Sequence, residues 1–406
     1  MFIISLLVTF NVKFPTLIFN SYFMKKVILA ATTLVLLIIS CSPNDSTNAQ
    51  INIERRDSVS IFDFVDSISV VQLETTKDVL LSRTSGIVLH KNRLYIMSGE
   101  KQVIYCFDSK GRFLFKMNNQ GRGPQEFTYS GHFNVDPFLD QLMVLVPWGI
   151  LINYDLDGNF ISKVQLPPDL RAYNEVYAID KDKLLFFTWG YDFYAYYYSK
   201  STATLSKGFV PTTVDFSMSF PPFRKSYYYK DSLYFNNVGL KNEVLNLSDT
   251  TCRSVYSWDF GEKNYTLKQM QDLVEYDLSF RGKTPTKESQ LQRFKERHEN
   301  PKFPAYYSYG GFETDKFRAT TLVSGWPHKF INVIKEKQKG KSYVFFETKE
   351  GLKLSLTSSW GNSVIINYNE VDIPALKKVL KSEDIKTIES HNPENDNPLY
   401  IIYHFK

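Results

Sequence analysis

The chain has 406 residues, a formal net charge of +5 and an aromatic content of 16%. This charge is small for the length of the chain, and nucleic-acid-binding domains carry a clear basic excess, so the composition argues against a nucleic-acid partner. Three cysteines are too few for the disulfide framework of a small secreted scaffold.

Residues 24–40 have the layout of a bacterial secretory signal peptide. A basic start precedes an apolar run of 13 residues, Val27 to Ile39, which is shorter than the roughly 20 residues of a membrane-spanning helix. The run ends at Ile38-Ile39-Ser40-Cys41, which resembles a lipobox, so we expect Cys41 to carry a lipid. The protein is therefore predicted to lie in the cell envelope of a Gram-negative bacterium, anchored by its lipid in the outer membrane. It could face either the periplasm or the outside of the cell.

Two segments flank this signal. Residues 1–23 are interpreted as the result of a start codon called too early, with Met24 as the initiator. A membrane hairpin is the alternative, although neither half of it is long enough to span a bilayer. Residues 41–53 are mostly small and polar and are expected to form a flexible tether.

From residue 54 to 406 the sequence is dominated by short strands of Val, Ile, Tyr and Phe that end at Asn, Asp or Gly. One turn occurs twice, as Phe107–Phe113 (FDSKGRF) and again about 47 residues later as Tyr154–Phe160 (YDLDGNF). Units of roughly 40–50 residues with several strands each are typical of propeller blades. The length gives six to seven blades, and we predict an all-β, six-bladed β-propeller.

A helical insertion is predicted at about 264–300. Thr266 and Gln269 fit a capping box at its start, and a second helix is expected from Lys287 to His298. Apolar residues at helical spacing predict which face of the first helix is buried: Leu267, Met270, Val274 and Leu278.

Shorter signals concern the end of the chain and its two remaining cysteines. Asp372, followed by Ile and Pro, predicts a third, short helix. Residues 399–403 are expected to form a strand that completes a blade begun by the N-terminal part of the chain. Cys106 and Cys252 are expected to be buried free thiols, with a single disulfide between them as the alternative.

Residues 120–127 (QGRGPQEF) carry a family resemblance, together with the two repeated turns. The chain resembles the six-bladed β-propeller lipoproteins of the Bacteroidota, which have a similar Gly- and Pro-rich stretch between two blades. Residues 68–76 resemble the opening of that family and residues 396–399 its closing segment. The resemblance implies the fold and a place in the cell envelope. The likeness of that family to NHL-type propellers implies a binding surface by analogy only.

The 120–127 stretch has two interpretations. Its glycines allow backbone N–H groups to converge on an anion, with Arg122 adding positive charge. The alternative is a rigid crossing between blades in which Glu126 caps neighbouring amides, and this reading is favoured because Gly in propellers usually serves close packing.

Two aromatic stretches supply the other candidate ligand contacts. Trp189, Tyr191 and Asp192 lie next to a turn and fit carbohydrate recognition, whereas the alternating tyrosines after them fit core packing. A second set lies in loop-like sequence: Tyr309, Trp326 and His328.

No catalytic, metal or cofactor motif is present in the sequence. We therefore expect a non-catalytic binding or scaffolding module for a glycan, a peptide or an envelope protein, without a metal or cofactor. The alternative is a polysaccharide lyase or glycoside hydrolase with its site at the mouth of the central channel. That alternative predicts carboxylates, or a Tyr–His pair, converging at the channel mouth.

Overall fold

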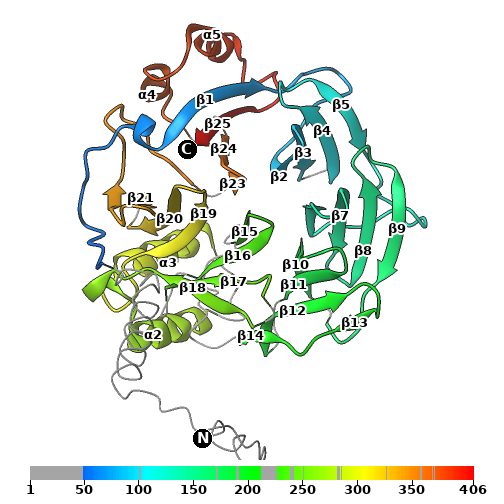
Figure 1. Ribbon diagram of the computed structural model, residues 1–406, viewed down its shortest axis with the longest axis horizontal. Helices are drawn as coiled ribbons and strands as arrows, with labels where there is room; N and C mark the ends of the chain where they lie inside the picture. Colours follow the sequence, from blue (N-terminus) through cyan, green and yellow to red (C-terminus); the bar gives the residue numbers. More distant parts are fainter. Residues whose placement is uncertain are drawn as a thin grey trace, which may run out of the picture. The chain divides into compact units, whose positions relative to one another are not determined.

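The computed structural model describes residues 49–99, 102–170, 172–188, 192–211, 226–237, 242–249, 251–280, 284, 286–325, 327–356, 359–367, 369 and 371–406. Residues Gln50–Lys406 form one compact unit. Within it the described strands form six antiparallel sheets around a common centre (Figure 1). The predicted six-bladed β-propeller is therefore confirmed.

The blades follow one another in chain order, each starting with its innermost strand. Blades 1 and 2 consist of β2 (Thr84–His90), β3 (Arg93–Ser98), β4 (Val103–Asp108) and β5 (Phe113–Met117), then β6 (His132–Asp136), β7 (Gln141–Val146), β8 (Ile150–Asp155) and β9 (Phe160–Gln165). Blade 3 consists of β10 (Tyr173–Ala178), β11 (Lys183–Thr188), β12 (Phe193–Ser199), β13 (Thr204–Leu205) and β14 (Phe209–Pro211). Blades 4 and 5 consist of β15 (Ser226–Tyr229), β16 (Ser232–Asn237), β17 (Glu243–Asn246) and β18 (Arg253–Ser257), then β19 (Tyr307–Glu313), β20 (Phe317–Ser324), β21 (Lys329–Glu336) and β22 (Ser342–Phe345). Blade 6 consists of β23 (Ser359–Trp360), β24 (Ser363–Asn367), β25 (Leu399–Phe405) and β1 (Val65–Gln72).

The ring is closed by pairing the two ends of the propeller. Strand β1 is the outermost strand of blade 6 and pairs antiparallel with β25, from Val65 opposite Phe405 to Gln72 opposite Leu399. The prediction that the last strand completes a blade begun by the N-terminal part is confirmed. This closure joins residues more than 300 positions apart, so it ties the stability of every blade to the whole ring.

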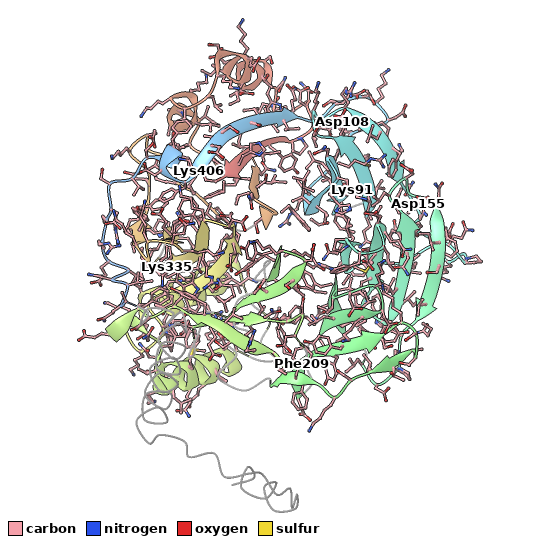
Figure 2. The ribbon with its side chains drawn as sticks, in the orientation of Figure 1. Lys91, Asp108, Asp155, Phe209, Lys335 and Lys406 are labelled. Carbon is pink, nitrogen blue, oxygen red and sulfur yellow. The ribbon has the colours of Figure 1, made fainter. Side chains whose placement is uncertain are left out.

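The repeated turn of the sequence joins the third and fourth strands of blades 1 and 2. The Asp108 carboxylate accepts hydrogen bonds from the backbone N–H groups of Lys110 (2.9 Å) and Arg112 (3.0 Å). Asp155 does the same for Asp157 and Asn159. Figure 2 shows Asp108 and Asp155 at the outer rim of neighbouring blades. An Asp side chain that mimics a backbone turn explains why this residue recurs.

The three predicted helices are present with one correction, and the described residues form two 3₁₀ helices and one further α-helix that were not predicted. The helices are η1 (Ile61–Asp63), η2 (Gly261–Lys263), α2 (Leu267–Leu278), α3 (Lys287–Glu299), α4 (Ile373–Lys377) and α5 (Ser382–Ser390). Thr266 caps α2 in the predicted capping box, and Asp372 caps α4. The predicted apolar stripe on α2 is wrong in part: Met270 and Leu273 are buried, whereas Leu267 and Val274 are exposed. The helix lies on the propeller along a narrower face than the spacing suggested.

The two cysteines of the propeller are free: Cys106 is buried and Cys252 half-buried. The expected free thiols are confirmed, and the structure contains no disulfide between them. Burial raises the pKa of the Cys106 thiol to about 12 and that of Cys252 to about 11. Both thiols are therefore protonated and unreactive near neutral pH. Among the described residues, no helix has the length and apolar character needed to cross a membrane.

Candidate functional site

The strand order defines two faces of the propeller. Neighbouring strands run in opposite directions, so the crossings between blades and the turns between second and third strands emerge on one side, here named the crossing face. The helical hairpin α2–α3 lies in the crossing from blade 4 to blade 5 and belongs to this face. Arg122, Asp192 and His328 belong to it as well, but they come from three different parts of the ring.

The central channel holds a small cavity. Innermost strands of five blades line it, with Val88, Asn134, Tyr177, Tyr228 and Trp360 among the lining residues. Its volume is about 50 Å³, which is room for only about four water molecules. Pockets for small organic ligands are commonly about 300–1,000 Å³, so this cavity is too small for a sugar.

Hydrogen bonds to the backbone fix several of the polar groups in this cavity. Asn134 donates to the carbonyl of Val176 (3.1 Å), and the Tyr228 hydroxyl donates to that of Ala178 (2.8 Å). The rings of His132 and Tyr177 lie 5.8 Å apart, so a Tyr–His pair does line the channel. No Asp or Glu belongs to the described lining.

The 120–127 loop binds its own backbone amides. The Glu126 carboxylate accepts a hydrogen bond from the N–H of Gly123 (2.7 Å), and the N–H of Gly121 donates to the Phe127 carbonyl (2.9 Å). A side chain on Gly121 would overlap the Glu126 carboxylate. This geometry agrees with the rigid-crossing interpretation. Arg122 is exposed at the edge of the loop, and its role in binding an anion stays a prediction.

The structure places the remaining candidate residues unequally. Asp192 is exposed after β11. Tyr309 and His328 both belong to blade 5, but Tyr309 contacts the ring of Phe330 (5.0 Å between ring centroids), whereas His328 contacts that of His298 (4.6 Å). Four of the candidates lie outside the described residues: Cys41, Trp189, Tyr191 and Trp326.

His328 and Phe330 line a pocket of ligand size, here named the blade-5 pocket. Its volume is about 430 Å³. The walls come from the start of β21, the end of β22, the crossing to blade 6 and the segment before β1. They are Arg56, Asp57, His328, Lys329, Phe330, Phe345, Phe346, Glu347 and Lys353.

The segment 55–57 is held rigidly against blade 5 at this pocket. The N–H of Asp57 donates to the carbonyl of Val344, and the Asp57 carboxylate accepts from the N–H of Val344, both at 2.7 Å. The same carboxylate pairs with Arg55 (2.8 Å). Arg56 stacks its guanidinium on the ring of Phe346, 3.5 Å from the centroid. The guanidinium therefore covers one face of this ring, and it also donates to the carbonyl of Ile53 (3.0 Å).

The electrostatics of the blade-5 pocket favour an anion. Three cations, Arg56, Lys329 and Lys353, face two carboxylates, and Arg55 already neutralises that of Asp57. Burial lowers the pKa of His328, so its imidazole is neutral at pH 7. The pocket thus combines aromatic walls with a net positive charge. Its residues are far apart in the sequence, and only His328 was identified from the pattern.

Two exposed aromatic residues on the crossing face of blade 2 were missed by the sequence reasoning. Tyr129 precedes β6, and Trp148 lies in the turn between β7 and β8. Their rings are 5.9 Å apart and meet edge to face. The available signal was the Pro-Trp-Gly turn at 147–149, which puts a large aromatic side chain where no strand can bury it.

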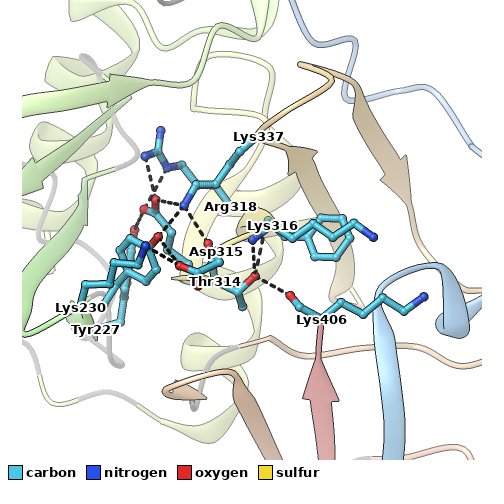
Figure 3. Close-up of polar contacts among 11 residues, drawn as sticks. Tyr227, Lys230, Thr314, Asp315, Lys316, Arg318, Lys337 and Lys406 are labelled. Atoms are coloured by element: carbon cyan, nitrogen blue, oxygen red, sulfur yellow. Dashed lines mark hydrogen bonds and ion pairs between the residues drawn. The ribbon is translucent and has the colours of Figure 1, made fainter.

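A buried ionic cluster lies between blades 4 and 5 on the opposite face (Figure 3). Glu313 pairs with Arg318 through two oxygens (3.0 Å each) and with Lys337 (2.7 Å). Lys337 also donates to the backbone carbonyl of Thr314. The Thr314 hydroxyl in turn donates to the backbone carbonyl of Lys406. These three charges all belong to blade 5 and bind one another. Blade 4 is connected to them through the hydroxyls of Tyr227, which donates to Glu313 (3.5 Å), and Tyr229, which accepts from Lys337 (3.1 Å). Among the described residues, no group of three or more His, Cys, Asp or Glu side chains is placed to hold a metal ion.

The fold and these sites define a class of protein: a six-bladed β-propeller whose crossing face carries a charged, aromatic pocket. The chain belongs to the family described as domain of unknown function DUF4934, whose model matches residues 46–404.

Two solved structures share the fold. A putative exported protein from Bacteroides fragilis is 15% identical with a TM-score of 0.62, covering 87% of this chain and 98% of its own. A member of the DUF4221 family from Bacteroides vulgatus is 9% identical with a TM-score of 0.53, covering 87% of this chain and 99% of its own. No curated protein matches the chain.

Proposed function

We propose that this protein is a lipid-anchored binding module of the bacterial cell envelope, related to the propeller lipoproteins of the Bacteroidota, and that its ligand is an acidic glycan. The signal-like segment and Cys41 support export and anchoring, and the similar structure from Bacteroides fragilis is that of a putative exported protein. Substitution Cys41→Ser is expected to abolish metabolic labelling with palmitate and to release the protein from the outer-membrane fraction. Unchanged labelling and fractionation would refute the anchor.

The observation that carries the binding function is the blade-5 pocket. Its volume of about 430 Å³ lies within the range of pockets that bind small ligands or single sugar rings. Arg56 supplies a cation, and the half-buried ring of Phe330 in the same lining supplies a flat apolar surface. A sugar ring presents C–H groups to such a surface, and a ring carboxylate pairs with a guanidinium. A uronic acid has both features on one ring.

The test is a titration of the full-length protein with acidic and neutral hexasaccharides, oligogalacturonate against a neutral β-1,4-glucan. We expect Arg56→Ala and Lys353→Ala each to weaken oligogalacturonate binding about tenfold, which corresponds to the loss of about 1.4 kcal/mol. Lys349→Ala is the matched control, because Lys349 is exposed in the same crossing and does not line the pocket. Equal affinity of the Arg56 variant and the wild type would refute this site.

A second candidate function is catalysis on the same class of glycan at the central channel. The contact between His132 and Tyr177 supports it, because a histidine and a tyrosine can act as base and acid. The narrow cavity requires the reacting bond to lie at the mouth. Incubation with oligogalacturonate followed by chromatography of the products tests it. Products that disappear in His132→Ala, while binding at the blade-5 pocket persists, would favour catalysis. An unchanged substrate would refute it.

A further inference from the structure

Trp148 is the most exposed of the large apolar side chains that the structure describes. Its relative exposure is 65%, and that of its neighbour Tyr129 is 46%. The two rings meet at an interplanar angle of 70° with their centroids 5.9 Å apart. The pair therefore forms an open corner with one aromatic face on each side. Burying both rings against a partner would remove apolar surface that the fold leaves in water.

The backbone around Trp148 is fixed, so the exposure of its ring does not come from a loose loop. The carbonyl of Pro147 accepts from the N–H of Tyr173 (3.0 Å). The carbonyl of Gly149 accepts from the N–H of Leu166 (2.8 Å) and from the Gln165 side chain (2.9 Å). Gly149 has a φ of +92°, a conformation that glycine adopts without strain. The turn thus presents the indole in one place.

The loop that carries Tyr129 is tied down as well. The N–H of Ser130 donates to the buried side chain of Gln102 (2.9 Å), and the N–H of Gly131 donates to the carbonyl of Leu145 (2.9 Å). Both aromatic side chains are thus mounted on backbone that is already ordered. Little backbone entropy remains to be lost when a ligand stacks on them, which favours binding by a small surface.

The size of the patch favours a sugar ring over a protein partner. A stable protein interface covers about 800 Å² on each partner, far more than two side chains supply. The other exposed apolar residues of blade 2 point elsewhere, because Leu139 lies in a turn on the opposite face and Ile161 on the outer strand β9. Two isolated rings match the C–H face of one or two pyranose units.

The charge of the surrounding chain selects the kind of sugar. Residues 127–131 and 146–150, which carry the two rings, contain no Asp, Glu, Lys or Arg. A neutral pyranose loses no favourable charge pairing here, whereas the net positive blade-5 pocket suits an acidic one. We propose that Tyr129 and Trp148 form a second, independent binding site for the neutral pyranose rings of a glycan chain. This inference does not depend on the ligand of the blade-5 pocket.

The experiment is a fluorescence titration of the full-length protein with four neutral hexasaccharides: β-1,4-glucan, β-1,4-xylan, β-1,4-mannan and α-1,4-glucan. We expect at least one to shift tryptophan emission saturably. Trp148→Ala should weaken its binding about tenfold or more, and Tyr129→Ala about threefold to tenfold, as for aromatic residues at the centre of a binding site. Trp148→Phe keeps a stacking face and should retain part of the affinity.

Two controls separate this site from general effects. Phe62→Ala removes another exposed ring, 43% accessible and outside blade 2, and should leave the affinity unchanged. Arg56→Ala should weaken oligogalacturonate binding but leave the neutral hexasaccharide bound, so the two sites can fail separately. The proposal is overturned if none of the four hexasaccharides binds, or if Trp148→Ala binds as tightly as the wild type.

Discussion

Gly111 lies directly against the backbone carbonyl of Gln72, the last residue of the strand that closes the ring. The glycine has a φ of +81°, and a Cβ built on it would overlap that carbonyl oxygen. Its own carbonyl accepts from the N–H of Glu74 (2.8 Å). Gly158, with a φ of +84°, packs in the same way on Phe115 of blade 1. The turns of blades 1 and 2 thus each pack closely against the preceding blade.

Substitution Gly111→Ala should therefore destabilise the propeller by about 2–4 kcal/mol, because the methyl group adds steric overlap to an unfavourable backbone conformation. Urea unfolding followed by circular dichroism measures the loss. Gly361→Ala is the matched control: that glycine also has a positive φ (+56°), but beyond its chain neighbours no atom lies within 4 Å of the point where a Cβ would stand. A Gly111 variant no less stable than the Gly361 variant would contradict the packing argument.

Asn397 joins the two segments that carried the family resemblance at the start and end of the propeller. It is fully buried, accepts from the N–H of Leu81 (2.7 Å) and donates to the carbonyls of Glu74 (2.6 Å) and Val79 (2.8 Å). Asn397→Ala would remove the partner of the Leu81 N–H and of the Glu74 carbonyl, whereas the Val79 carbonyl would still accept from the N–H of Thr76 (3.3 Å). The two lost partners should cost about 2–3 kcal/mol. Thermal unfolding of this variant, beside the exposed Asn395→Ala, provides the measurement. Equal melting temperatures for the two would disprove the role.

Most of the fold was predictable because its signals are local. Phe107–Phe113 and Tyr154–Phe160 form the same turn. In each, an Asp accepts from the backbone N–H groups two and four residues ahead, and a glycine follows it at positive φ. Capping boxes such as that of Thr266 are equally local. The stripe on α2 was wrong at Val274, because periodicity shows that a helix is amphipathic but not how wide its contact with the neighbouring blades is.

The pocket was hardly predictable because its residues have no sequence proximity. Arg56 and Lys353 line the same pocket only because β1 pairs with β25 and so brings the N-terminal segment next to the C-terminal blades. Each is an ordinary surface residue in the sequence. His328 was identified because it stands in an aromatic loop, and Trp148 was overlooked because one aromatic residue in a turn forms no pattern with its neighbours.

Glu313 is the only acid that directly pairs with both Arg318 and Lys337 in the described cluster between blades 4 and 5. Glu313→Gln keeps the shape but leaves two cations close together, with Glu313 itself only 3% exposed. We expect a loss of about 3 kcal/mol, typical of breaking a buried ion pair from one side. Asp315→Asn breaks the exposed pair with Lys230 and should cost less than about 1 kcal/mol. Equal costs in urea unfolding would contradict the argument.

His298 makes the stability of the helical hairpin depend on pH. Burial, with contributions from His328 and Arg297, lowers the pKa of its imidazole to about 4. Below pH 6.5 the unfolded chain binds a proton at this residue while the folded chain does not, so stability falls as the pH drops from about 6.5 to about 4 and is complete above that window. At pH 5 the loss from this residue is about 1–2 kcal/mol.

Unfolding free energies at pH 7 and pH 5 test this for the wild type and His298→Asn. The variant is expected to be less stable at pH 7, because it loses the ring contacts with Tyr307 and His328, but its stability should fall less on acidification. Carboxylates contribute equally to both proteins, so the difference between the two pH slopes isolates the imidazole. A proton NMR titration that gives His298 a midpoint near 6.5, or parallel slopes for both proteins, would show that the imidazole is not buried in its neutral form.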